Sequence, residues 1–317
     1  MRRILVIKTS SLGDVVHALP AVSDMARHCP GVEFDWMVEE SFQAIPLLHP
    51  AVRRIVPVAT RRWRKAVWSA ATWQDFKTLR ATLVSGRYDL AIDFQGLIKS
   101  ALLSLLAPTH RAGYSWACAR EPLATLAYQE NFTVPWTLHA VERNRQLAAQ
   151  ALGYTPDAPV CYGLRPPAAQ PEWAPSEPYA VLLHATSRPH KEWPEDHWIR
   201  LGIALSGQGL RSVIPGGSPM ERARSQRLAA GIPAALAAPA MTLHEVAQLL
   251  GHARLVVGVD TGLSHLAVAL GRPVAAIFTA TRPEDTGVYG SPCAVNCGGR
   301  RQIPSVDAVL QALPAPC

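Results

Sequence analysis

The sequence predicts an α/β protein made of two Rossmann-like domains. Two series of short apolar runs, each alternating with longer helical patterns, follow one another along the chain, and a proline-rich stretch separates them. Alternating strands and helices are typical of parallel sheets with helical crossovers. The length of 317 residues also suits two domains. Because such folds bind ligands at the carboxyl ends of their strands, we expect the two domains to face each other across a binding cleft.

The first domain is expected over residues 1–160. Its opening run, residues 3–8, is apolar enough for a buried parallel strand. Further strand patterns cover residues 34–38 and 88–94, with helical patterns between them. A helical pattern also covers residues 15–28, and Pro20 inside it predicts a kink or a break.

A proline-rich stretch follows the first domain. Seven prolines lie between residues 155 and 178, at positions 156, 159, 166, 167, 171, 175 and 178. Proline fixes φ and removes a backbone donor, so this stretch cannot be regular core structure. We interpret residues 161–178 as the interdomain linker. A long surface loop inside one domain is the alternative, but a second α/β series begins directly afterwards.

The second domain is expected over residues 179–317. Strand patterns cover residues 179–184, 210–214, 255–259 and 274–278, and helical patterns cover 193–207, a stretch from 242, and 261–270. Thr242 followed by Glu245 forms the pattern of a capping box, which predicts that a helix begins there. Gly271 and Pro273 predict the end of the helix at 270.

Composition limits the possible partners and the location of the protein. With 31 Lys and Arg against 24 Asp and Glu, the formal charge is +7. This favours anionic partners, among them nucleotides, phosphorylated sugars, nucleic acid and acidic membrane surfaces. No apolar stretch approaches the roughly 20 residues of a membrane-spanning helix, and the apolar run after the N-terminal arginines is too short for a signal peptide. We therefore expect a cytoplasmic protein.

The cysteines predict neither a disulfide framework nor a metal site. The six are scattered along a long chain that has the character of an intracellular protein. Cys293 and Cys297 are close together, but their spacing does not match a zinc knuckle and no second pair follows.

Two groups of candidate site residues lie in the first domain. The first group follows the opening strand and contains Ser10, Ser11, Gly13 and Asp14. Its hydroxyls and the free amides of the next helix suit an anionic or sugar ligand, and Asp14 is either a general base or a residue that complements the helix dipole.

The second group is a basic run without acids between Glu40 and Asp75. It holds Arg61, Arg62, Arg64 and Lys65, interleaved with Trp63, Trp68 and Trp73. Such a run suits phosphates and carboxylates, an anionic membrane surface, or nucleic acid, although no nucleic-acid motif frames it.

Two more groups lie in the second domain. Thr186, Ser187 and Lys191 follow its first strand, where hydroxyls and an ammonium group can bind phosphate oxygens. Asp260, Thr261, Gly262 and His265 follow a later strand at the start of a helix. The free amides there favour anions, although Asp260 could simply cap the helix and His265 could simply be packed. These groups together indicate a grip on a nucleotide diphosphate. The absence of G-x-G-x-x-G and of a P-loop disfavours a nicotinamide oxidoreductase and a P-loop ATPase.

Taken together, these segments resemble the ADP-heptose:lipopolysaccharide heptosyltransferases, which are inverting glycosyltransferases of family 9 with the GT-B fold. The resembling stretches are KTSSLGDVVHALPA, FDWMVEE, RRWRKA, AREPLA, HAVER, HATSRPHKEWP and VDTGLSHL, in the order of the family. The resemblance implies transfer of L-glycero-D-manno-heptose from ADP-heptose to Kdo of Kdo2-lipid A. It also implies a peripheral position on the anionic cytoplasmic face of the inner membrane, with no metal ion, no cofactor and no nucleic acid.

The resemblance also implies roles for individual residues. It makes Asp14 the catalytic base and Lys191 the group that stabilises the leaving diphosphate. It assigns the acceptor to Ser10, Ser11, Gly13, Arg61, Arg62, Arg64, Lys65 and Arg120, and the donor to Thr186, Ser187, Lys191, Glu221, Met241, Asp260, Thr261, Gly262 and His265. Thr279-Ala280-Thr281 departs from the Gly-Pro-Thr usual in the family. The alternatives are transfer to a heptose acceptor, or a non-catalytic protein that binds nucleotide sugars or nucleic acid.

Overall fold

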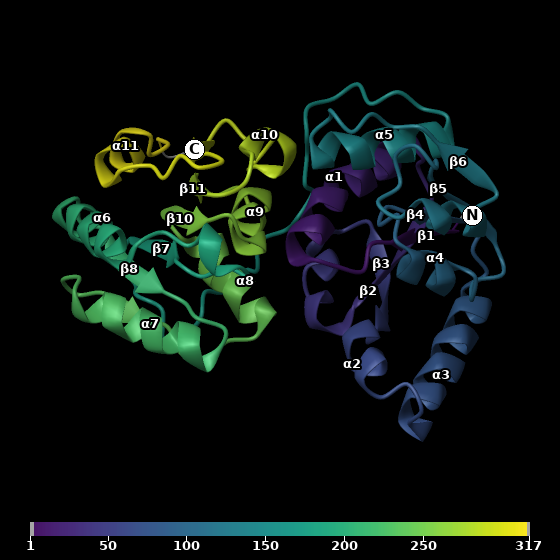
Figure 1. Cartoon of the computed structure of the whole chain (residues 1–317), viewed down its shortest axis with the longest axis horizontal. Coiled ribbons are helices and arrows are strands. Elements are labelled where there is room, and N and C mark those ends of the chain that lie inside the picture. Colours follow the sequence, from purple (N-terminus) through teal and green to yellow (C-terminus); the bar gives the residue numbers. More distant parts are fainter. Residues whose placement is uncertain (1–2, 316–317) are drawn as a thin grey trace. The chain divides into compact units, whose positions relative to one another are not determined.

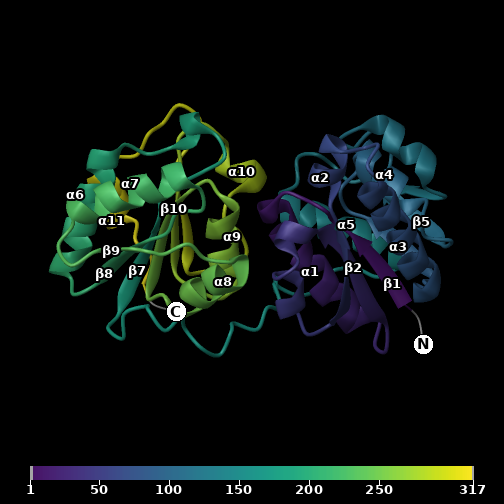
Figure 2. The same cartoon turned by 90° about the horizontal axis from the view of Figure 1, so that it is seen from below.

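The computed structural model describes residues 3–315. The chain folds into two compact units, Met1–Leu164 and Arg165–Cys317. Figures 1 and 2 show that each unit is a sheet flanked by helices. The boundary between the units falls inside the stretch interpreted above as the linker. No helix within the described residues is long and apolar enough to span a membrane.

The first unit is built on a six-stranded parallel sheet with the order β3-β2-β1-β4-β5-β6. Its strands are β1 (Arg3–Ile7), β2 (Glu33–Glu39), β3 (Val52–Val58), β4 (Leu90–Asp93), β5 (His110–Tyr114) and β6 (Glu130–Phe132). Its helices are α1 (Leu12–His28), α2 (Thr60–Lys65), α3 (Ala70–Gly86), α4 (Ile98–Ser104) and α5 (Ala140–Leu152), with short 3₁₀ turns η1 (Glu40–Phe42), η2 (Pro46–Leu48) and η3 (Pro122–Ala127). Strands β1 and β4 pair at the centre, so their carboxyl ends lie side by side.

The second unit repeats this plan with the strand order β12-β11-β10-β7-β8-β9. Its strands, all parallel, are β7 (Tyr179–Leu183), β8 (Arg211–Ile214), β9 (Leu236–Ala237), β10 (Leu255–Val259), β11 (Val274–Phe278) and β12 (Ala294–Gly298). Its helices are η4 (Pro189–Lys191), α6 (Glu195–Gly207), α7 (Pro219–Ala230), α8 (Leu243–His252), α9 (Gly262–Ala269), α10 (Pro283–Thr286) and α11 (Val306–Gln311). The central strands β7, β10 and β11 are buried along their whole length, as expected for a parallel sheet covered on both faces. The prediction of an α/β protein is confirmed.

Of the kink or break expected at Pro20, the break is wrong. Helix α1 runs without interruption from Leu12 to His28, with Pro20 inside it. Pro20 and the residues beside it are buried, and α1 packs against α5. This tertiary packing offsets the loss of one backbone hydrogen bond.

Cys293 is disulfide-bonded, whereas Cys118, Cys161 and Cys297, also among the described residues, are free thiols. The sequence did not predict this bond, because spacing alone does not show which cysteines meet. The bond also removes the thiolate of Cys293 from the pair considered above for zinc. Within residues 3–315, no three His, Cys, Asp or Glu side chains cluster so that they could hold a metal ion.

Candidate active site

The loop after β1 lies against the loop after β4. The register pairs Ile7 with Asp93, so Lys8 and Phe94 follow at the same edge of the sheet. The Lys8 ammonium donates to the Phe94 carbonyl at 2.6 Å. The Gln95 side-chain oxygen accepts from the amides of Thr9, at 3.1 Å, and Ser10, at 3.2 Å. These bonds fix the loop that leads into α1.

Asp14 is the third residue of α1, and both of its carboxylate oxygens have partners. Oδ2 accepts from the amide of Ser11 at 3.0 Å and from its hydroxyl at 2.9 Å, which caps the helix. Oδ1 accepts from Arg120 Nη2 at 2.9 Å. Asp14 therefore lies at the start of α1 as the structural interpretation expects, and it also faces a cation.

The charges around Asp14 keep it ionised. Burial alone would raise the pKa of Asp14, but the nearby Lys8, Arg120 and His17 outweigh burial and hold the pKa of Asp14 well below its usual range. Burial lowers the pKa of Lys8 to about 8, partly opposed by the charge of Asp14. Asp14 is thus an anion at neutral pH, held among cations.

Asp14 lines a small cavity of about 20 Å³. The other residues around it include Lys8, Gln95, Arg120 and Arg143. The Arg143 guanidinium lies 3.4 Å from the centre of the Trp136 ring and donates to the Cys118 carbonyl at 3.1 Å. Three cationic side chains therefore surround one carboxylate at the carboxyl edge of the first sheet.

Sequence reasoning missed several residues of this cavity. Lys8 was part of the first motif but was given no role, and Gln95 and Arg143 were not singled out. Two signals could have found them. Gln95 lies two residues after β4, which pairs with β1, and Arg143 ends the HAVER stretch, which is part of the family resemblance.

The arginines of the basic run lie on β3 and α2, and acids from outside the run compensate part of their charge. Arg62 pairs with Asp75 at 2.7 Å and with Glu40 at 3.3 Å. Trp63 is buried and its indole N–H also donates to Asp75, at 2.8 Å. Arg53 and Arg54 pair with Asp35. The expectation of an uncompensated run is therefore wrong for these arginines, since the fold brings in acids that are distant in sequence.

The remaining cations of α2 differ from Arg62 in their surroundings. The Arg61 guanidinium lies 5.3 Å from the centre of the Phe42 ring. Arg64 and Lys65 are exposed and form no ion pair within residues 3–315. Arg64 and Lys65, together with the exposed Arg61, are thus available to a ligand.

A cavity of about 280 Å³ lies in the second unit, at the carboxyl ends of β7 and β8. Five of the predicted donor residues line it, namely Thr186, Ser187, Glu221, Met241 and Thr261. The Glu221 Oε2 atom accepts from the amides of Gly217 at 2.8 Å and Ser218 at 2.9 Å, which caps α7. Both bonds use Oε2, so Oε1 can accept from the hydroxyls of a ligand.

Asp260 organises the loops beside this cavity. Its Oδ2 atom accepts from Lys191 Nζ at 2.6 Å and from the Thr281 hydroxyl at 2.5 Å. Its carbonyl accepts from the Thr186 hydroxyl at 2.9 Å. The Thr279 hydroxyl donates to the His190 carbonyl at 3.2 Å. The Thr279-Ala280-Thr281 segment therefore ties η4 and Asp260 together.

Four predicted donor residues do not line the cavity. Lys191 and Asp260 pair with each other next to it. Gly262 is the first residue of α9, and His265 is buried within that helix. The structure thus places His265 inside the unit, as in the alternative reading of a packed residue.

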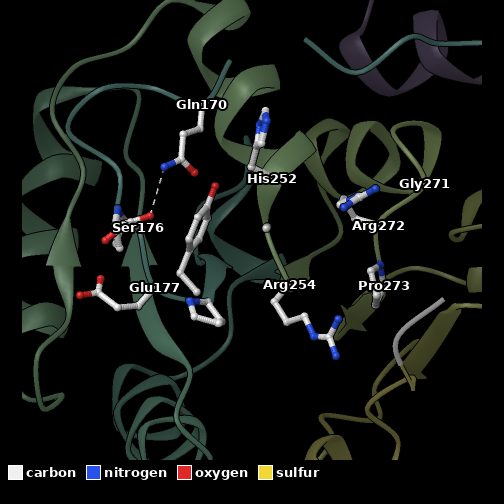
Figure 3. Close-up of a pocket in the computed structure, with 12 residues that line it drawn as sticks. Gln170, Ser176, Glu177, His252, Arg254, Gly271, Arg272 and Pro273 are labelled. Atoms are coloured by element: carbon white, nitrogen blue, oxygen red, sulfur yellow. Dashed lines mark hydrogen bonds between the residues drawn. The ribbon is translucent and has the colours of Figure 1, made fainter. Parts of the chain in front are cut away.

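A second cavity of the same unit, of about 350 Å³, lies at the amino ends of the strands (Figure 3). Gln170, His252, Arg254 and Arg272 are among its lining residues, and none of the predicted site residues is. Ligands of parallel α/β sheets bind at the carboxyl ends of the strands. The smaller cavity at that edge is therefore the candidate nucleotide site.

Comparison with known proteins identifies the family of the chain. The profile of glycosyltransferase family 9 (heptosyltransferase) matches residues 76–312. The chain is 44% identical to lipopolysaccharide heptosyltransferase 1 of Salmonella typhimurium, over 96% of this chain and 97% of the relative. It is 47% identical to the protein of that name from Pseudomonas aeruginosa, over 91% and 81%.

Among solved structures, it is similar to the E. coli heptosyltransferase WaaC, determined with ADP, at 43% identity and a TM-score of 0.90 over 98% of both chains. WaaC has also been solved with ADP-2-deoxy-2-fluoro heptose, and that structure matches with a TM-score of 0.87. The identity and the coverage extend over nearly the whole chain and both units. The chain therefore belongs to glycosyltransferase family 9, the heptosyltransferases, and has the GT-B fold.

Proposed function

We propose that the protein transfers L-glycero-D-manno-heptose from ADP-heptose to Kdo of Kdo2-lipid A, with inversion and without a metal ion. The proposal rests on the observation that a chain of this family contains two separate candidate sites. One is a cavity in the second unit lined by hydroxyls and an acid, and the other is a carboxylate surrounded by cations in the first. The relatives named above are heptosyltransferases of lipopolysaccharide, and WaaC binds ADP and a fluorinated ADP-heptose.

The donor occupies the cavity of the second unit. Glu221 Oε1 accepts from the ribose hydroxyls, while Thr186 and Ser187 donate to the diphosphate. Lys191 lies 2.6 Å from Asp260 in the structure. The Lys191 ammonium group also donates to a diphosphate oxygen of the donor. The amino end of α9 adds a partial positive charge beside the diphosphate.

The acceptor presents a carboxylate, which suits the cations around Asp14. Arg120, Lys8 and Arg143 line that cavity, and a planar guanidinium binds a carboxylate with two parallel hydrogen bonds. Arg64 and Lys65 are exposed on α2 and bind phosphates of the lipid. Ser10, Ser11 and Gly13 shape the loop at which the sugar rests.

The acceptor also activates the base. Asp14 with a strongly depressed pKa is a weak proton acceptor, and its bond to Arg120 is one cause of that depression. A substrate carboxylate that binds Arg120 neutralises this cation, so the pKa of Asp14 rises toward the range useful for general base catalysis. The base becomes effective when the acceptor is bound.

The reaction is then an in-line displacement. Asp14 removes the proton of a Kdo hydroxyl as its oxygen attacks the anomeric carbon of the heptose. The bond from that carbon to the diphosphate oxygen breaks, and the electron pair leaves with ADP. Attack opposite the leaving group inverts the anomeric configuration. Lys191 and the start of α9 stabilise the negative charge that develops on ADP.

The enzyme acts at the cytoplasmic face of the inner membrane, bound peripherally to an anionic surface, because its acceptor is a lipid. Its net charge of +7 is consistent with that surface.

Mass spectrometry of Kdo2-lipid A incubated with ADP-heptose tests the proposal, and the expected product carries one added heptose with acceptor-dependent release of ADP. Product formed only from an acceptor that already carries heptose would show the alternative specificity. Binding of ADP-heptose or nucleic acid without turnover would overturn the catalytic role.

A further inference from the structure

Exposed apolar side chains concentrate on the first unit. Among the described residues, twelve of the fifteen large apolar side chains that are exposed belong to it. Five of them lie on α4, on the residue that follows α4, and on η3, and we name them the α4–η3 face: Ile98, Leu102, Leu105, Leu123 and Leu126. Leu126 is 80% exposed and Leu102 is 59% exposed. This concentration exceeds the scattered exposure of single apolar residues that is normal on a protein surface.

The spacing of these residues places them on one side of each helix. Ile98, Leu102 and Leu105 are four and three residues apart, which is the spacing of one α-helical face. Leu123 and Leu126 are three apart, which aligns them on a 3₁₀ turn. The two elements pack against each other, and Ala101 and Ala124 are buried in a common cluster. The small side chains form the contact between the helices, and the large ones lie exposed.

The α4–η3 face adjoins the site around Asp14. Lys99, next to Ile98, donates to the Ser10 hydroxyl at 2.9 Å. Arg120, three residues before Leu123, donates to Asp14 at 2.9 Å. The amide of Ile98 donates to Glu121 at 2.6 Å, so the segments that begin α4 and η3 are tied together at this point. Apolar surface and candidate acceptor site are therefore parts of one region of the first unit.

We propose that the α4–η3 face inserts into the surface of an anionic lipid bilayer and holds Asp14 at the level of the lipid headgroups. Lys99 adjoins this face and the chain carries a net charge of +7, and leucines inserted at the headgroup boundary of a basic protein are the arrangement of proteins that lie on anionic membranes. A second copy of the chain fits less well, because two chains that each carry a charge of +7 repel each other. Of the three tryptophans of the basic run, Trp63 is buried and cannot insert, whereas Trp68 and Trp73 are exposed. The inference rests on the proposed function only for the reason why the enzyme needs a membrane.

Vesicle binding without any sugar substrate tests this surface. The probes are vesicles of phosphatidylcholine alone and of phosphatidylcholine with phosphatidylglycerol. The α4–η3 variant is the double substitution Leu102→Ser with Leu126→Ser. A matched control carries Ile203→Ser with Met220→Ser, which are exposed residues of the second unit. We expect the parent and the control to sediment with the anionic vesicles, and the α4–η3 variant to lose about tenfold or more in partitioning. Thermal melting must show all three proteins folded to the same extent.

Activity provides a second readout that a structural defect would not reproduce. With Kdo2-lipid A embedded in vesicles, we expect the α4–η3 variant to show a raised acceptor KM. With a deacylated, water-soluble Kdo acceptor, we expect its kcat/KM to equal that of the parent. Equal vesicle partitioning of parent and variant would overturn the proposal. So would a parent that is dimeric in solution and becomes monomeric in the variant, because the face would then be an interface between copies. Vesicle binding needs no donor or acceptor, so it remains interpretable if the proposed transfer activity fails.

Discussion

The guanidinium of Arg120 donates to the carboxylate of Asp14 across 106 residues of sequence, at 2.9 Å. The same carboxylate caps α1 through Ser11. Substitutions here therefore affect charge, proton transfer and helix capping together. Experiments that separate these three effects are the informative ones.

Asp14→Asn separates proton transfer from capping. Asparagine keeps the size of the side chain and an oxygen that can accept from Ser11, but it cannot take a proton. We expect the fold and ADP affinity to be retained while kcat falls by about 10²–10⁴, the usual contribution of general acid–base catalysis. The measurement is kcat for transfer, with melting temperature and ADP affinity of the same protein as controls. A folded, ADP-binding variant that turns over within about threefold of the parent would contradict the role as base.

Arg120→Ala removes a cation that lowers the pKa of Asp14. We expect the pKa of Asp14 to rise toward its ordinary value, although Lys8 continues to lower it. The acid limb of kcat/KM should therefore move to higher pH, and the acceptor KM should rise. The pH profiles of parent and variant test this, with Arg200→Ala on the exposed surface of the second unit as the control. An unchanged acid limb would show that Arg120 does not act on Asp14.

Lys8 gives the acceptor site a pH dependence on the alkaline side. Its pKa is lowered to about 8, so Lys8 is cationic below that pH and loses its charge as the pH rises through it. Binding of an anionic acceptor should weaken above about pH 8. Lys8→Met should raise the acceptor KM at pH 7 and abolish this alkaline loss, whereas Lys77→Met on the exposed surface of α3 should do neither. If acceptor binding still weakens at alkaline pH in Lys8→Met, another group causes the loss.

Lys8 should also affect stability, with the opposite pH dependence: acceptor binding weakens as the pH rises, whereas the free energy of unfolding increases. Between about pH 8 and the ordinary pKa of lysine, 10.5, folded Lys8 is neutral while unfolded Lys8 is still protonated. The unfolded state then binds more protons, so the contribution of Lys8 to the free energy of unfolding rises with pH in this window. Denaturant titrations at pH 7.5 and 9.5 should show this increase in the parent relative to Lys8→Met. A difference between the two proteins that does not change with pH would contradict the lowered pKa.

Lys191→Ala tests the donor site. We expect weaker ADP binding, by roughly 1.5–3 kcal/mol for a charge-assisted contact, and slower transfer. Because Lys191 pairs with Asp260 at 2.6 Å, the double variant with Asp260→Asn is also needed. If Lys191 acts on the diphosphate, the loss should persist in the Asp260→Asn background. Equal ADP affinity of Lys191→Ala and the parent, measured by calorimetry, would count against this role.

The basic helix α2 should divide into structural and ligand-binding cations. Arg62 is paired with Asp75 and Glu40, so Arg62→Ala should mainly lower the melting temperature. Arg64→Ala with Lys65→Ala should leave stability unchanged, raise the acceptor KM and weaken its salt dependence, because salt screens exposed charges. Donor affinity should not change in either variant. A fall in donor affinity, with no change of acceptor KM, would show that α2 does not bind the acceptor.

Much of the fold could be predicted from local sequence. The strands at 255–259 and 274–278 have the predicted bounds, and the capping box at Thr242 and Glu245 forms as predicted. Apolar runs and caps act over a few residues, so their effect is visible in the sequence. The motif residues Asp14, Thr186 and Asp260 could also be found in this way, because they follow strands whose carboxyl ends carry sites in parallel sheets.

Tertiary structure alone decided which charges meet. The pairs Arg120–Asp14 and Lys191–Asp260 join residues 106 and 69 positions apart, and Asp75 compensates Arg62 from the next helix. Tertiary packing likewise keeps α1 intact at Pro20. A sequence shows which groups carry charge or lack a donor, but Coulomb energy and desolvation depend on distances and burial, which exist only once the strands are placed side by side.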